Sequence, residues 1–241
     1  MDYRLECKYK SSDFRSKNGI GAKDPIPFKA LLSKLSILCV FKPLSDEISG
    51  MVGQLKKVKF MLINSNHSIG RQNFTIAHEI YHIFYDKYFK TTIVDFKNDN
   101  EGEEKKANTF ASYLILPEDG LIDLIPEKEK SKNRITIQTL VKIEQYYQAS
   151  RRALLFRLKN MNFIDDKYIE KNNNSIINQA RMLGYDISLY LKGNENVVIG
   201  EYTSLAKVLY DNDIISESNY IDYLIDIGIN PKEIELNAFE E

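Results

Sequence analysis

Two histidines four residues apart, with a glutamate beside the first, carry the clearest chemistry in this sequence. They are His78, Glu79 and His82, in the segment HEIYH. On a helix, residues i and i+4 share a face, so both imidazoles can bind one metal ion. Glu79 is rotated by about 100° and stays outside the ligand set, where it would act as a general base on the attacking water. The spacing predicts a hydrolytic site that uses one Zn²⁺ per chain.

A hydrolytic zinc ion usually has three protein ligands, so this site needs one more. The only other histidine, His67, lies in the loop before the histidine pair, and neither cysteine (Cys7 or Cys39) is near in sequence. A carboxylate is therefore the simplest third ligand. The next predicted helix opens with three glutamates: Glu101, Glu103 and Glu104.

Spacing favours Glu104 among these three. Glu104 shares a face with the small residues Ala107 and Ala111, which would let its helix approach the histidine helix closely. Glu103 aligns instead with a more solvated face. We therefore predict Glu104 as the third ligand, although an ordinary acidic first turn remains the alternative for each glutamate. Asn108, one turn further on, is a candidate to orient a ligand by a hydrogen bond, or else to satisfy backbone groups.

The elements around these residues predict a mixed α+β domain. Residues 70–86 are apolar on nearly all sides and predict a buried helix. Residues 37–41 and 58–64 are short apolar runs rich in β-formers and predict strands. Residues 101–117 predict the second site helix. We expect loop over residues 13–27, which contain two glycines and two prolines.

Two more strands and two further helices are predicted elsewhere. The apolar segments 93–96 and 196–202 are strand candidates. Near the end of the chain, Ser216 and Gly228 are placed to cap the start and end of a helix.

These motifs resemble the ImmA/IrrE family of bacterial metallopeptidases. The resemblance rests on RQNFTIAHEIYHIF and on E-x-x-A-N-x-F-A-x-x-L-x-x-P from Glu104 to Pro117, and it covers about residues 15–117. It implies a small gluzincin-like fold, zinc ligands at His78, His82 and Glu104, and Glu79 as the catalytic base. It also implies a helix-turn-helix repressor as protein substrate, cleaved to relieve repression in a mobile-element or stress response. Tyr81 is one departure, because the family often has glycine before the second histidine.

The sequence predicts three parts. They are a zinc metallopeptidase domain (1–130), a helix-turn-helix-like helical region (131–170) and a small module of unknown role (175–241). In the middle part, Ser150 would cap a second helix that carries Arg151, Arg152, Arg157 and Lys159. These basic side chains could contact DNA, but we favour packing on the peptidase or holding the repressor.

Composition limits the remaining functions. The chain has 241 residues and a formal net charge of −1, so DNA binding would need a local basic patch. It has two separated cysteines, no apolar run long enough for a membrane span and no signal-peptide core. We expect a reduced, cytoplasmic protein with no membrane partner.

Two functions are consistent with the sequence. The first is an intracellular zinc endopeptidase, and we expect its substrate, an extended peptide, to pair with the strand at 58–64. The second is a DNA- or protein-binding regulator with a structural or vestigial metal site. Glu79 favours the first, because a structural site needs no general base.

Overall fold

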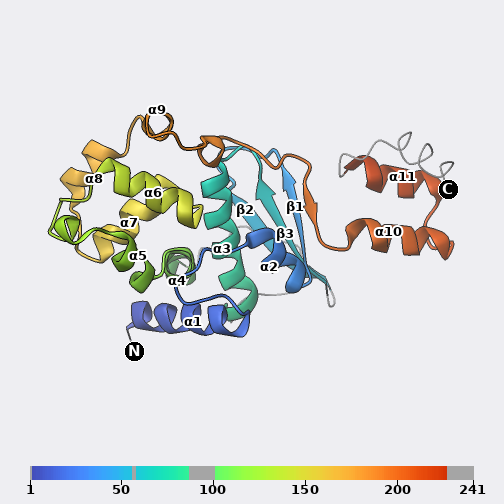
Figure 1. The fold of residues 1–241 in the computed structure, drawn as a ribbon. Helices are drawn as coiled ribbons and strands as arrows, with labels where there is room; N and C mark the ends of the chain where they lie inside the picture. The colour runs from blue at the N-terminus through green and yellow to red at the C-terminus, as the bar shows by residue number, and fades with distance from the viewer. Residues whose placement is uncertain (1, 56–57, 87–100, 227–241) are drawn as a thin grey trace.

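The fold is a computed structural model that describes residues 2–55, 58–86 and 101–226 (Figure 1). The helices are α1 Tyr3–Lys17, α2 Phe28–Lys34, α3 Ile69–Tyr85, α4 Glu101–Ile115, α5 Glu118–Leu124, α6 Ile137–Tyr147, α7 Arg151–Asn160, α8 Asp166–Asn172, α9 Ile176–Met182, α10 Tyr202–Asp211 and α11 Glu217–Asp226. The strands are β1 Ile37–Lys42, β2 Gly50–Leu55, β3 Val58–Asn64 and β4 Val198–Ile199. The predicted α+β class is confirmed. The strand predicted at 93–96 lies outside the described residues.

The four strands form one mixed sheet in the order β2-β3-β1-β4. β1 and β3 are parallel, while β2 pairs antiparallel with β3 and β4 pairs antiparallel with β1. Along β1, the buried residues Ile37, Cys39 and Phe41 alternate with half-buried ones, as expected for a strand with one face on the core. β3 is thus an interior strand, and the expectation that a substrate pairs with residues 58–64 is wrong. Among the described strands, β2 is an edge.

α3 lies between the sheet and α4, and α1 packs against α4 (Figure 1). α3 is a buried helix, and its residues Ile76, Ala77 and Ile80 are all at most 2% exposed. α4 presents Ala107 and Ala111 to the same core, and both are fully buried. These small side chains allow α3 and α4 to pack closely, as the sequence predicted. The two site helices are therefore held side by side.

α1 differs from the sequence prediction, because the loop expected over residues 13–27 overlaps the last part of this helix. The helix runs from Tyr3 to Lys17 and is fixed by a few residues only. Cys7 and Phe14 are buried, and the buried Arg15 donates hydrogen bonds to the Leu114 carbonyl oxygen at 2.7 and 3.0 Å. Arg15 thereby satisfies a carbonyl at the end of α4, which ties the first helix to the site helix.

α6 and α7 are two helices joined by a short turn at residues 148–150, and they share the core of the sheet and α3. The Ser150 hydroxyl accepts a hydrogen bond from the Ala153 amide at 3.3 Å, so its predicted capping role is confirmed. Leu140 and Leu154 belong to the same buried cluster as Ile76. A Cβ on Gly70, in the first turn of α3, would lie 2.8 Å from the Ser150 backbone nitrogen, so the α6–α7 turn packs directly on α3. The three-part division of the chain stays a prediction.

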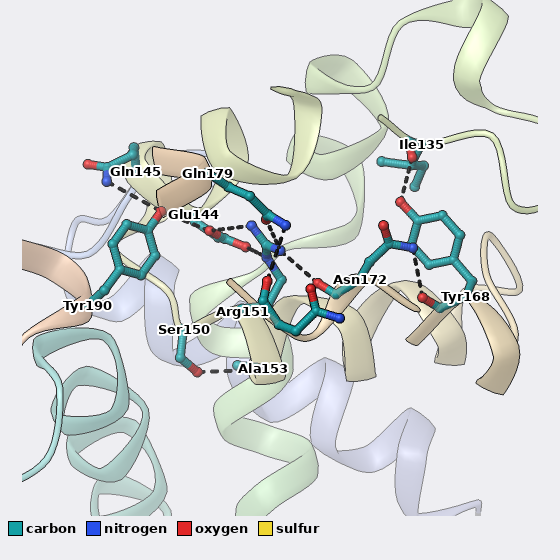
Figure 2. A network of polar contacts seen from close by, with 11 residues as sticks. Ile135, Glu144, Gln145, Ser150, Arg151, Ala153, Tyr168, Asn172, Gln179 and Tyr190 are labelled. Atoms are coloured by element: carbon teal, nitrogen blue, oxygen red, sulfur yellow. Dashed lines mark hydrogen bonds and ion pairs between the residues drawn. The ribbon is translucent and has the colours of Figure 1, made fainter. Parts of the chain in front are cut away.

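Two of the four basic residues of α7 are buried and engaged inside the protein. Arg151 forms an ion pair with Glu144 of α6 and donates hydrogen bonds to the Asn172 carbonyl oxygen at 2.8 Å and to Gln179 Oε1 at 2.9 Å (Figure 2). Arg157 is 2% exposed. Of the four basic residues, only Arg152 and Lys159 are exposed. The burial removes half of the basic face that a DNA contact would use.

The last two helices, α10 and α11, pack on each other and extend away from the sheet (Figure 1). The start of α11 is confirmed at the predicted cap, since Ser216 Oγ accepts a hydrogen bond from the Asn219 amide at 3.2 Å. Gly228, the predicted end signal, lies outside the described residues. Of the predicted strand at 196–202, only β4 is extended. Across the described residues, no helix has both the length and the apolar character that crossing a membrane requires.

Candidate metal centre

Three predicted ligands meet where α3 and α4 pack together. His78 and His82 project from one face of α3, and Glu104 projects from the first turns of α4. Each Glu104 oxygen faces a different imidazole: Oε2 lies 3.2 Å from His78 Nε2, and Oε1 lies 3.2 Å from His82 Nε2. The two Nε2 atoms are themselves 3.2 Å apart. Within the described part of the chain, these three residues form the one group with metal-ligand geometry.

These separations suit a tetrahedral zinc ion. Bonds of about 2.0–2.1 Å directed at tetrahedral angles place neighbouring ligand atoms about 3.3 Å apart. The two Nε2 atoms lie 3.2 Å apart, and each lies 3.2 Å from one oxygen of Glu104, so the carboxylate faces both imidazoles. The donor set, two imidazoles and one carboxylate, is also one that zinc prefers, and it leaves a fourth position for water. The residues present therefore fit the metal.

The outer nitrogen of each imidazole is held by an oxygen. His78 Nδ1 donates to Asn108 Oδ1 at 3.1 Å, and His82 Nδ1 donates to Asp86 Oδ2 at 2.9 Å. A proton on Nδ1 leaves the lone pair of Nε2 free to bind the ion. Asn108 thus lies where the sequence predicted a ligand-orienting residue. Asp86 was not predicted, although its spacing of four residues after His82 places it on the same helical face.

The electrostatics of the cluster favour a positive charge at its centre. Hydrogen bonds from His78 and His82 hold the pKa of the Glu104 carboxyl well below its usual range. Burial opposes a charge on His82, yet hydrogen bonds to Glu104 and Asp86 raise its pKa to about 9. A cation bound between these groups would take the place of that proton.

The other two glutamates of the α4 start differ from Glu104. Glu103 accepts a hydrogen bond from the buried Tyr81 hydroxyl at 2.7 Å and pairs with Lys106 at 2.6 Å. It is therefore committed to a structural contact away from the ligands, and Tyr81 itself has a role in joining α3 to α4. The side chain of Glu101 lies outside the described residues.

Glu79 has the environment expected of a buried base. It is 7% exposed, and burial raises the pKa of its carboxyl, while the charges of His78 and His82 oppose that rise. A carboxylate with a raised pKa accepts and returns a proton more readily near neutral pH. His67, the third histidine, is 6% exposed in the loop before α3 and is not part of the ligand group.

Comparison with known proteins places these residues in a family. No curated protein matches this chain at a significant level. The family model Peptidase_M78, described as the IrrE N-terminal-like domain, matches residues 32–159, more than half of the chain. The match includes both site helices and also α6 and α7. The chain therefore belongs to this peptidase family, in agreement with the resemblance to ImmA/IrrE metallopeptidases.

Proposed function

We propose that this protein is a zinc-dependent endopeptidase that cleaves a helix-turn-helix transcriptional repressor inside the cell. The observation that carries the enzymatic part is the approach of His78, His82 and Glu104 to 3.2 Å beside the buried carboxylate of Glu79. The repressor substrate follows from the resemblance to ImmA/IrrE peptidases.

The residues of the site divide the work of peptide hydrolysis. Zinc bound by His78, His82 and Glu104 would supply a Lewis acid that polarises the scissile carbonyl and lowers the pKa of water. Glu79 takes the proton of the attacking water and then delivers it to the leaving amine. Asn108 and Asp86 keep the two imidazoles oriented throughout.

We propose that the substrate backbone binds along the edge strand β2. β2 lies next to α3, and a Cβ on its Gly50 would come within 2.6 Å of Thr75 Cγ2 on that helix. A peptide that pairs with the outer edge of β2 gains main-chain hydrogen bonds and lies alongside the helix that carries the candidate metal ligands. This replaces the strand at 58–64 as the proposed docking strand.

The alternative, a regulator with a structural metal site, is less well supported. A structural site has a closed set of four protein ligands, whereas only three meet here among the described residues. The burial of Arg151 and Arg157 also weakens the case for DNA as the main partner.

Incubation with the repressor encoded beside its gene tests the proposal. We expect the zinc-loaded protein to cut the repressor at one or a few bonds, and a chelator to stop the cleavage until zinc is restored in excess. A repressor that stays intact under every metal condition would contradict the proposed function.

A further inference from the structure

A pocket of about 590 Å³ adjoins the metal centre and has no role in the mechanism described so far. It lies between α1, α4 and α7. Its α4 wall begins at the metal ligand Glu104 and continues through Asn108 to Ser112, so the pocket and the metal centre share a wall. Phe156 of α7 forms part of its rim and is 48% exposed, an unusual place for a large aromatic side chain.

Two buried polar groups of the pocket lining lack hydrogen-bond partners among the described residues. They are Ser112 Oγ and Arg157 Nη2. Ser112 is 3% exposed and Arg157 is 2% exposed. Such groups normally find a partner, because leaving one unsatisfied costs about 1–3 kcal/mol. Acceptor oxygens of a ligand would satisfy these groups, since a hydroxyl and a guanidinium can each donate a hydrogen bond.

Arg157 is held rigidly for such a contact. Its Nε donates to the Leu116 carbonyl oxygen at 3.1 Å, and its guanidinium carbon lies 4.2 Å from the centre of the Tyr113 ring. The nearest carboxylate, Glu118, lies 3.5 Å from Nη2 and pairs more closely with Lys8 at 2.8 Å. The guanidinium is therefore fixed in place with its charge only partly compensated.

The rim of the pocket is also positive. Arg4 and Lys105 are exposed and lie over the Tyr3 ring, at 6.0 and 5.0 Å from its centre. In the described ranges, neither has a carboxylate within ion-pair distance. Glu104 is the one acidic residue of the lining, and its oxygens face the imidazoles. The lining thus presents three cations to a ligand, together with aromatic rings.

We propose that this pocket is a specificity subsite that receives an acidic side chain, Asp or Glu, of the peptide substrate. This inference rests on the proposed function. Ser112 lies two helical turns from Glu104, about 12 Å along the axis of α4. An extended peptide advances about 3.3 Å per residue, so the acidic residue lies within about four residues of the scissile bond. Arg157 and Ser112 are then specificity residues, and α7 contributes to substrate selection.

Peptide binding tests the subsite without requiring cleavage. The probes are fluorescein-labelled octapeptides of alanine, serine and leucine, each with one glutamate at a different position, and matched peptides with glutamine. Fluorescence polarisation measures their affinity for the full-length, metal-free protein. We expect at least one glutamate peptide to bind about tenfold more tightly than its glutamine match, because it gains a charge-assisted hydrogen bond.

Two variants locate the binding. Ser112→Asp places a carboxylate in the pocket lining and should abolish the preference for glutamate. The control is Ser112→Asn, whose side chain has nearly the shape of aspartate but no charge, and it should keep the preference. Because a buried substitution can disturb folding, a second variant changes only the exposed rim. Arg4→Glu with Lys105→Glu should also reduce the preference, while Lys29→Glu, exposed on α2, should not.

Equal binding of glutamate and glutamine peptides would overturn the inference, as would a preference that survives both Ser112→Asp and the rim variant. Absence of any peptide binding would also overturn it. Failure of the proposed function gives a different result, namely glutamate-selective binding by a protein whose zinc-loaded form cuts no repressor.

Discussion

Each metal-binding imidazole is fixed by one oxygen, and these oxygens set which nitrogen can bind the ion. His78 is oriented by Asn108 and His82 by Asp86. Such contacts raise the basicity of the ligand and reduce the entropy lost when the metal binds. The candidate metal site therefore comprises five residues: four in α3 and α4, and Asp86 directly after α3.

Removing Asp86 tests this arrangement. We expect Asp86→Ala to weaken zinc binding about 10- to 100-fold, because His82 loses the acceptor that holds its Nδ1 proton. Competition against a chromophoric chelator measures the affinity. Asp123→Ala, which removes an exposed carboxylate paired with Lys23, should bind zinc like the unchanged protein. Equal affinities of the two variants would contradict the role of Asp86.

The meeting of the three candidate ligands could be predicted because it depends on helical spacing. His78 and His82 lie one turn apart, and Glu104 shares its face with alanines that allow close packing. Asp86 was missed because a carboxylate at the end of a helix looks like an ordinary surface residue. Ser112 and Arg157 could not be identified, because they meet only through the packing of α7 on α4.

At the scale of elements, a buried ion pair between Glu144 and Arg151 joins α6 to α7, and hydrogen bonds from Arg151 extend this contact to α8 and α9. Burial raises the pKa of the Glu144 carboxyl, and the Arg151 guanidinium opposes that rise. The Tyr190 hydroxyl donates a second contact to Glu144 at 2.8 Å (Figure 2). The pair is fully desolvated, so each charge depends on the other.

Arg151→Met should therefore destabilise the protein by about 3–5 kcal/mol, because it leaves Glu144 buried without its cation. Urea unfolding followed by circular dichroism measures the loss. The double variant Glu144→Leu with Arg151→Met should recover part of it, since no unpaired charge remains. Arg152→Met, on the exposed neighbour, is the control and should change stability little. A loss for Arg151→Met no larger than for this control would contradict the account.

Strands and helices differed in how well the sequence predicted them. β1 and β3 are apolar and β-branched, so their pattern was clear. β2 was missed because glycines at two positions hide its pattern. One of these, Gly53, lies under the Phe60 ring, where a Cβ would come within 2.1 Å of a ring carbon. α1 was missed because most of its residues face solvent and only a few, such as Cys7 and Phe14, enter the core.

For the whole molecule, the metal should link α3 to α4 and so stabilise the native state. The ligands come from two helices, and the unfolded chain has no preformed site. At a free zinc concentration 100 times the Kd, binding contributes about 2.7 kcal/mol, which corresponds to a rise in Tm of roughly 5–10 °C. Calorimetry with zinc and with chelator measures this shift. His82→Ala should show little or none of it, and an equal shift in that variant would place the zinc elsewhere.

Across the whole molecule, α6 and α7 pack together with the helices that carry the candidate metal site. They share one buried core with these helices, and α7 lines the pocket beside the metal centre. The net charge of −1 and the burial of two arginines agree with a protein partner better than with DNA. Such a role depends on tertiary packing, which spacing along the sequence does not reveal.

The central claim is that Glu79 acts as the base beside a zinc ion held by His78, His82 and Glu104. The most direct test compares the cleavage rates of the unchanged protein and Glu79→Gln on the repressor, at equal zinc content determined by mass spectrometry. The account predicts one zinc per chain in both and a rate about 10²- to 10⁴-fold lower for Glu79→Gln. Equal rates at equal zinc content would contradict it.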